Sequence, residues 1–202
     1  MEHQDPHTQT SIRQVRQLWF GSYHGILSTH STTFSDYPFG SLVPLCRDSD
    51  GVPLLLLSHL AQHTKNLDNN PHCSLFLAEQ RQTDIQQLKR LTCLATAEQV
   101  DSIPPAISER YFRYYPQARI YQETLNFNFY RLKPQRLFFV GGFGTARWFD
   151  INRILPACGL SHEDESQFYN NLNSKEITGS LSQIVGIDCL RLDLNLGAVM
   201  NG

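Results

Sequence analysis

The chain has 202 residues, of which 41% are hydrophobic and 11% aromatic, and its formal net charge is −2. This length suits one domain with a well-buried core and is short for two full domains. A charge so close to zero provides no field that would attract a polyanion, so nucleic acid is not an expected partner.

The apolar runs and the start of the chain predict a cytoplasmic protein. Runs such as Leu54 to Leu57 are far shorter than the roughly 20 residues of a membrane span. The first residues, MEHQDPHTQT, lack the basic and then apolar order of a signal peptide. The five cysteines form no CxxC pair, so neither a disulfide framework nor a zinc site is indicated. Three of them lie in apolar runs and are expected to be small buried hydrophobes: Cys46, Cys73 and Cys93.

The first part of the chain predicts a helix, a three-strand meander and a second helix. Residues 1–10 lack periodicity and are expected to form a flexible tail. Apolar residues then recur on one helical face: Ile12, Val15, Leu18 and Trp19. Three strands follow, separated by turn-forming Ser, Asp and Gly residues: 22–30, 38–46 and 52–58. A short helix is predicted over 59–70, where Asn-Asn-Pro ends it.

The middle of the chain continues the strand pattern. Strands are predicted at 72–79 and 90–100, with a polar loop of about ten residues between them. Residues 104–126 favour a helix rich in tyrosine, entered through Pro104 and Pro105. Two more strands fit 127–133 and 136–143. About seven strands with few helices predict a mainly β barrel with helical additions.

The composition changes after Asp150, where the chain becomes polar and acidic. Residues 11–150 are therefore predicted to form the barrel domain, and 151–202 a small appended subdomain. Within the latter, the segment from Ile177 to Leu196 predicts a helix followed by the strand-like IDCLRLDL.

Four segments in this order resemble a known family: YPFGSLVPL (37–45), LLLLSHLAQHTKNL (54–67), RLTCLATAE (90–98) and FFVGGFGTARWF (138–149). They resemble the pyridoxamine 5′-phosphate oxidase-like family of FMN-binding split barrels, in the branch that includes bacterial haem-utilisation proteins. The likeness covers residues 12–150, and AQHTKN and GGFGTARW are its most specific parts. It implies a split β-barrel of the α+β class with flanking helices and a small C-terminal α/β appendage. It also implies a homodimer that holds FMN, or in the haem branch haem, in a cleft built from both subunits.

The resemblance places a flavin phosphate beside the second and third strands and the helix that follows. The corresponding residues are Ser41, Val43, Ser58, His59, Gln62, His63, Thr64, Lys65 and Asn66. The chemistry agrees, because a strand that leads into a helix offers free N–H groups and a positive dipole end. The Thr64 hydroxyl and the Lys65 ammonium add phosphate donors. The alternative is that His63 and Asn66 cap the helix and Lys65 is merely solvated.

Several departures weaken the comparison with the oxidases themselves. The resemblance implies an arginine where this chain has Ser41 and an Arg-Lys pair where it has His63-Thr64. Fewer fixed positive charges predict weaker phosphate binding. The terminal arginine-containing signature for their vitamin substrate is also absent, so that activity is not expected.

The GGFGTARW segment offers a second contact for a planar ligand. Its glycines permit a sharp turn, and Phe143 and Trp148 supply large aromatic faces on which a ring can stack. The alternative is a glycine-rich bulge with core aromatics.

Haem would need an axial donor, most often an imidazole. The resemblance places two histidines in the C-terminal segment, where this chain has Asn171-Leu172-Asn173 and Lys175-Glu176. His162 is the lone tail histidine and becomes a ligand only if haem binds, although His24 or His63 of the barrel can substitute. The run from His162 to Glu165 is interpreted as a solvated acidic turn, not a metal site.

Three functions follow, and the first is an FMN-binding oxidoreductase-like protein in which no catalytic side chain can be named. The second is a haem-binding protein involved in haem utilisation or degradation. The third is a dimeric scaffold without a cofactor, as the missing arginine and histidines permit.

Overall fold

The computed structural model describes residues 6–48, 50–81, 84–142, 145–155 and 167, and the backbones of 182–187 and 192–196. The α-helices are α1 (Pro6–Gly21), α2 (Gln62–Asn69), α3 (Pro105–Tyr114) and α4 (Ala118–Thr124). The strands are β1 (His24–His30), β2 (Pro38–Pro44), β3 (Cys46–Arg47), β4 (Pro53–Ser58), β5 (His72–Ala78), β6 (Arg90–Val100), β7 (Phe127–Val140), β8 (Ala146–Asp150), β9 (Ser182–Ile187) and β10 (Leu192–Leu196). Two short 3₁₀ helices are η1 (Ile85–Gln87) and η2 (Ile151–Arg153).

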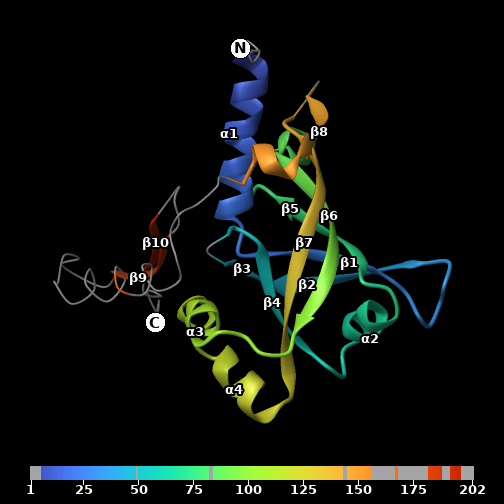
Figure 1. Cartoon of the computed structure of the whole chain (residues 1–202). Helices are drawn as coiled ribbons and strands as arrows, with labels where there is room; N and C mark the ends of the chain where they lie inside the picture. Colours follow the sequence, from blue (N-terminus) through green and yellow to red (C-terminus); the bar gives the residue numbers. More distant parts are fainter. Residues whose placement is uncertain are drawn as a thin grey trace.

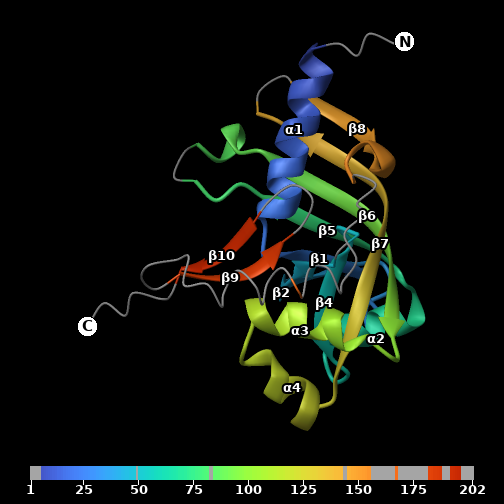
Figure 2. The ribbon, with the colours of Figure 1, turned by 60° about the vertical axis from the view of Figure 1, so that its left-hand side comes forward.

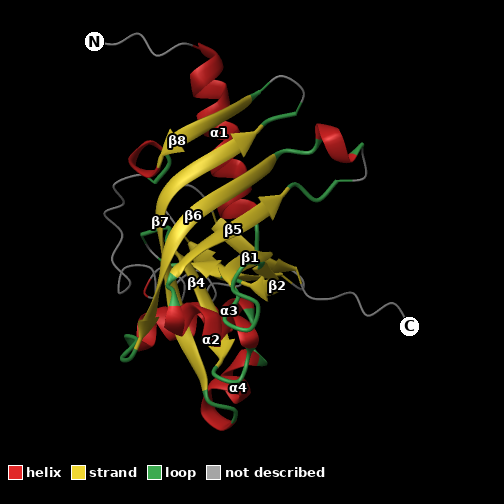
Figure 3. Ribbon diagram, turned by 90° about the vertical axis from the view of Figure 1, so that its right-hand side faces the viewer, coloured by secondary structure: helices red, strands yellow, loops and turns green. Residues whose placement is uncertain are grey.

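Eight of the strands form one antiparallel sheet. Its order is β2-β1-β5-β6-β7-β4-β3, with β8 paired to the far half of β7. Figures 1 and 2 show α1 beside one end of this curved sheet and α3 and α4 at the other. In Figure 3 the strands β5 to β8 lie side by side in one layer. The predicted mainly β split barrel with flanking helices is therefore confirmed.

The core lies between α1 and the concave face of the sheet. The predicted helical face is buried, with Val15 and Trp19 both fully inaccessible to solvent. Alternate residues of β1, β5 and β6 meet this face, as the period of two along a strand requires. A second, smaller cluster packs Ile107, Tyr111 and Phe112 of α3 against Phe129 of β7. The three cysteines predicted to be hydrophobes are buried and free.

Three local features differ from the sequence-based predictions in the barrel domain. Helix α1 begins at Pro6, inside the expected tail, because proline fits the first turn of a helix. The single helix predicted over 104–126 is two helices, because Pro116 has no N–H and forces Tyr115 out of helical geometry. The two strands predicted on either side of Pro134 are one strand, β7. A register shift opposite Leu94 and Ala95 places the extra residue, Gln135, in a bulge.

The C-terminal part differs as well. The segment from 177 was predicted to be helical, but residues 182–187 form strand β9, which pairs with β10. Pairing with the antiparallel strand β10 stabilises residues 182–187 as a strand. The local sequence pattern does not reveal such a pairing. The segment 151–155 belongs to the barrel core, since Ile154 is fully buried and its carbonyl accepts a hydrogen bond from Arg16 Nε at 2.9 Å. In the described part of the chain, no helix is both long and apolar enough to cross a membrane.

A pair of glycines on neighbouring strands gives a stability test of this packing. A Cβ added at Gly25 would lie 2.8 Å from the Phe76 carbonyl oxygen and 2.8 Å from Leu77 Cδ2, whereas one added at Gly40 would have its nearest neighbour at 3.5 Å. We expect Gly25→Ala to lower the free energy of unfolding by about 2 kcal/mol, because the clash involves backbone. Gly40→Ala should stay within about 0.5 kcal/mol of the natural chain. Urea denaturation measures both, and equal losses would contradict the packing.

Candidate functional site

A cleft of about 720 Å³ opens between strands β2 and β4 of the sheet and the helices α3 and α4. Most of its walls are apolar or aromatic: Leu42, Val43, Pro44, Leu56, Leu57, Ala61, Tyr111, Tyr114, Tyr115, Pro116, Ala118, Tyr121 and Phe127. Its polar lining consists of Ser58, His63 and Gln117. The volume lies within the range of about 300–1,000 Å³ that is usual for small-molecule sites. The cleft is therefore the best candidate for a ligand site in the described structure.

The aromatic wall is hydrogen-bonded to main-chain carbonyls next to strands β1 and β2. The Tyr115 hydroxyl donates a hydrogen bond to the Leu45 carbonyl at 3.0 Å and another to the Tyr23 carbonyl. Burial raises the pKa of Tyr115, and likewise that of Tyr111, so both phenols are neutral at physiological pH. Tyr121 of α4 stacks on Phe127 with ring centroids 5.5 Å apart. The wall thus presents neutral aromatic surface to the cleft.

His63 is the titratable imidazole of the lining. It lies in the first turn of α2, half-buried, and its Nδ1 is 3.1 Å from Ser41 Oγ on β2. Desolvation by burial lowers the pKa of His63, so the neutral ring predominates at pH 7. In the tautomer that donates from Nδ1 to Ser41, the Nε2 atom keeps a lone pair. A neutral, oriented imidazole of this kind is able to ligate a metal centre.

The predicted phosphate-binding residues separate into three groups. Val43, Ser58 and His63 line the cleft, and Ser41 contacts His63. Lys65 and His59 are exposed on the surface, where His59 Nδ1 lies 3.0 Å from the Asn126 carbonyl oxygen.

The third group holds the start of α2 in place and does not line the cleft. The buried Thr64 hydroxyl donates to the Ser58 carbonyl at 2.7 Å, so it is not free for the phosphate that the sequence suggested. Asn66 is fully buried, accepts from Thr32 N at 3.0 Å and donates to Thr29 Oγ1 at 2.9 Å. Gln62 donates to Asn66 Oδ1 at 2.8 Å. These side chains tie α2 to the β1–β2 connection.

The described residues of the glycine-rich segment follow the end of β7 and precede and begin β8. Gly142 has a φ of +103°, which favours glycine, and Gly141 N donates to the Thr145 carbonyl at 2.9 Å. Trp148 lies on β8, 57% exposed, with its ring 5.0 Å from that of Phe138. It does not line the cleft of its own chain. Phe143, His162, Asn171 and Glu176 lie outside the described residues, as does Gly144.

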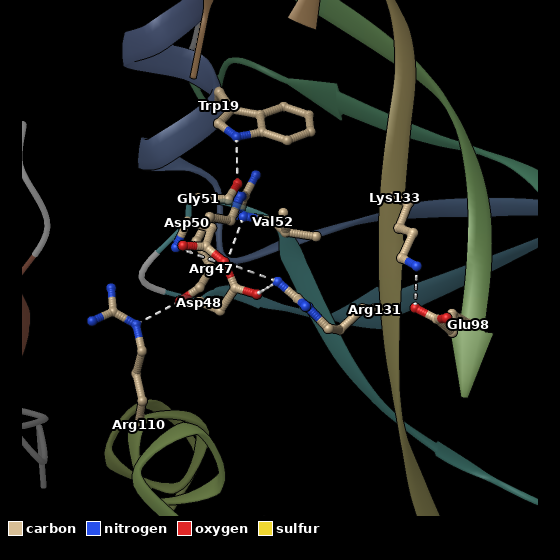
Figure 4. Close-up of polar contacts among 10 residues, drawn as sticks. All are labelled: Trp19, Arg47, Asp48, Asp50, Gly51, Val52, Glu98, Arg110, Arg131 and Lys133. Carbon is tan, nitrogen blue, oxygen red and sulfur yellow. Dashed lines mark hydrogen bonds and ion pairs between the residues drawn. The ribbon is translucent and has the colours of Figure 1, made fainter. Parts of the chain in front are cut away.

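A network of polar contacts connects the β3–β4 turn with β7 and α3 (Figure 4). Asp48, at the β3–β4 turn, is fully buried and pairs with Arg131 of β7, whose Nη2 lies 2.5 Å from Asp48 Oδ2. Asp48 Oδ1 accepts hydrogen bonds from the backbone N–H groups of Asp50 and Val52 at 3.0 and 2.9 Å. Arg110, on the same helix as the tyrosine wall, donates from Nε to the Arg47 carbonyl at 2.5 Å. The turn, β7 and α3 are thereby connected.

Arg47 and Trp19 complete this network. The Arg47 guanidinium lies 5.0 Å from the centroid of the Trp19 ring and donates to the Ser22 carbonyl at 2.6 Å. Desolvation lowers the pKa of Arg47 to about 10, which leaves the side chain charged at neutral pH. The Trp19 indole N–H donates to the Gly51 carbonyl at 3.0 Å. Sequence reasoning identified Arg47 to Gly51 only as a turn, and no local signal pointed to partners at positions 110 and 131.

The fold and cleft define a split β-barrel protein, and comparison with known proteins identifies its family. Residues 6–153 match the model of the CREG β-barrel family, so the chain belongs to that family. It is 35% identical over 136 residues to the chloroplastic non-canonical haem oxygenase HOZ of Arabidopsis thaliana, covering 67% of this chain and 41% of that protein. It is 32% identical over 119 residues to the haem oxygenase HutZ of Vibrio cholerae, covering 54% of this chain and 65% of that protein.

These matches confirm the resemblance to the haem-utilisation branch of split barrels. The chain spans less than two thirds of the length of either curated relative. Among solved structures, Atu2129 of Agrobacterium tumefaciens, a protein of unknown function, superposes with a TM-score of 0.79. That match is 21% identical and covers 98% of this chain and 89% of the other, which supports the fold alone.

Proposed function

We propose that this protein binds haem in the cleft between the sheet and the helices α3 and α4. The observation that carries the proposal is a large, mostly apolar cleft with one neutral, oriented imidazole in its lining. Haem is a flat apolar ring whose iron accepts an imidazole, so both features suit it. The two curated relatives are named as haem oxygenases, which supports the same ligand.

The lining fits haem better than it fits FMN, which the sequence alone ranked first. FMN needs fixed donors for a phosphate and for the polar edge of its ring. The cleft lining contains no lysine or arginine among the described residues, and the Thr64 hydroxyl is already bonded to Ser58. Haem carries its charge on two carboxylates at one edge, which can remain in water at the mouth of the cleft while the apolar edge is buried.

The side chains of this cleft would have three roles. His63 would hold the iron through Nε2, while Ser41 fixes the ring orientation through Nδ1. Tyr111, Tyr115 and the apolar strand residues would exclude water from the ring. Bound haem supplies redox chemistry with oxygen, and on the strength of the relatives' names we extend the proposal to haem degradation.

Haem titration of the purified protein tests this function. We expect a Soret band with an imidazole signature, and we expect His63→Ala to lose that signature and weaken binding at least about tenfold. His59→Ala is the matched control, since His59 is a nearby exposed histidine that does not line the cleft. FMN quenching measured in parallel gives the opposing outcome. Tight FMN binding with no haem complex would overturn the proposal.

We further propose a homodimer that forms through the outer face of the sheet, which is the face opposite to the one that packs on α1. Strand register aligns an outer-face row across β2, β1, β5, β6, β7 and β8: Leu42, Ile26, Phe76, Thr92, Phe138 and Trp148. Leu42 is 73% exposed, Ile26 43% and Trp148 57%. A contiguous apolar row of this kind is typical of an association surface. A second copy of the same chain would cover it in a self-complementary way.

Trp148→Glu should dissociate that dimer. A carboxylate beside the Phe138 ring in the interface would cost about 2 kcal/mol or more, so we expect dimer affinity to fall by roughly a hundredfold. Ile85→Glu is the control, because Ile85 is 71% exposed but lies off the row. Light scattering over a concentration series gives both affinities. A natural chain that is monomeric at tens of micromolar would contradict the dimer.

A further inference from the structure

A second groove, of about 670 Å³, lies on the outer face of the sheet and shares no lining residue with the cleft. It is bounded by β1, β5, β6 and the connection between β1 and β2. Its lining includes two histidines and a carboxylate, namely His30, His72 and Asp36, above a floor that includes Leu94 and Ala95. All three of those polar residues are exposed, so an ion in solution can reach them.

Strand register brings the two histidines to adjacent positions. β1 and β5 are antiparallel, with Ser28 opposite Ser74 and Thr29 opposite Cys73. The pairing of β1 with β5 ends there, and one further step in the same register would set His30 opposite His72. Both belong to the exposed, outer-facing set of their strands, as the burial patterns show. Opposed residues in an antiparallel pair have Cβ atoms about 4.5–5.5 Å apart, a separation that two imidazoles can bridge with one ion.

The His72 ring is held in the orientation that a metal ligand needs. Asn70 Oδ1 accepts hydrogen bonds from both the His72 backbone N–H and ring Nδ1, each at 3.1 Å. Because an amide oxygen only accepts, Nδ1 carries the proton and Nε2 keeps its lone pair. A carbonyl oxygen behind the ring is the usual outer partner of a metal-ligating histidine.

We propose that His30 and His72 form a site for one divalent transition-metal ion on this outer face, with Zn²⁺ or Cu²⁺ as the ion. Imidazole nitrogens suit these ions, and water completes the coordination. Among the described residues, no group of three or more His, Cys, Asp or Glu side chains is placed to hold a metal ion. The two imidazoles are therefore the protein ligands of the proposed site.

The test is a Zn²⁺ titration of the full, haem-free chain at pH 7.5, followed by calorimetry. We expect His30→Ala, His72→Ala and the double variant each to weaken one Zn²⁺ equivalent at least tenfold and to the same extent. That equality distinguishes a shared site from two independent ones. His24→Ala is the matched control, because His24 lies on the same strand and face but does not line the groove.

Two further measurements separate this site from the cleft and from nonspecific binding. The Zn²⁺ equivalent should persist in His63→Ala, because His63 lines the cleft and not the groove. Asn70→Ala should weaken Zn²⁺ binding about tenfold, because it removes the hydrogen-bond acceptor that orients the His72 ring. A natural chain that binds no Zn²⁺ at about 100 µM overturns the proposal. So do His30→Ala and His72→Ala variants that titrate like the natural chain.

Discussion

Replacing Arg131 with methionine is expected to lower the free energy of unfolding by about 3 kcal/mol. Asp48 is fully buried, and its Oδ2 has the Arg131 guanidinium as its ion-pair partner. Removal of one partner from such a pair leaves an uncompensated buried charge, which costs more than the pair itself contributes. Chemical denaturation monitored by tryptophan fluorescence measures the loss.

Lys133→Met provides the matched control on the same strand. Lys133 pairs with Glu98 at 2.7 Å, but the two side chains are 54% and 51% exposed. Water solvates both charges after the pair is broken, so the expected loss is below about 1 kcal/mol. If both variants lose the same free energy of unfolding, removal of Arg131 does not leave Asp48 as an uncompensated buried charge.

The loss of unfolding free energy in Arg131→Met, called here its stability deficit, should also depend on pH. Burial raises the pKa of Asp48, and the charge of Arg131 opposes that rise. Without Arg131 the folded-state pKa rises further above the unfolded value. Stability from such a group is present below the unfolded pKa and lost as the pH rises through the folded pKa. The deficit should therefore be larger at pH 7 than at pH 5, and a deficit that is constant between them would contradict this explanation.

Trp19→Ala is expected to cost about 4 kcal/mol, because it empties a large, fully buried site. The substitution also removes the N–H donor to the Gly51 carbonyl and the aromatic face beneath Arg47. Trp19→Phe separates these contributions, since it keeps most of the apolar volume but lacks the N–H. We expect it to lose about 1–2 kcal/mol. Urea unfolding followed by circular dichroism compares them, and a Phe variant as unstable as the Ala variant would assign the loss to the hydrogen bond.

Most of the barrel follows from local patterns along the chain. The apolar face of α1 and the alternation of β1, β5 and β6 are each set by a period that neighbouring residues display. The continuity of β7 does not follow in this way. Pro134 ends a strand by local rules, and only the bulge that forms against β6 allows the strand to continue through it.

The candidate site was predictable in part. The AQHTKN motif located the turn that carries His63, and Val43 and Ser58 also line the cleft. The motif did not show which side chains of that turn point inward, so Thr64 and Asn66 were assigned to a ligand although they bond to the scaffold. The tyrosine wall was missed as a site, because its position depends on the break at Pro116 that folds α4 against β7.

The helix α3, which forms one wall of the cleft, is held in part by side chains that donate to main-chain carbonyls. Arg110 bonds to the carbonyl of residue 47, and Tyr115 to the carbonyls of residues 23 and 45. A carbonyl is present whatever side chain its residue carries. These hydrogen bonds therefore depend on the side chains of Arg110 and Tyr115 and not on the side chains at positions 23, 45 and 47, although the Tyr23 ring also packs on Tyr114. Because Tyr115 both lines the cleft and anchors the end of α3, a substitution there is expected to change the chemistry of the lining and the position of the helix together.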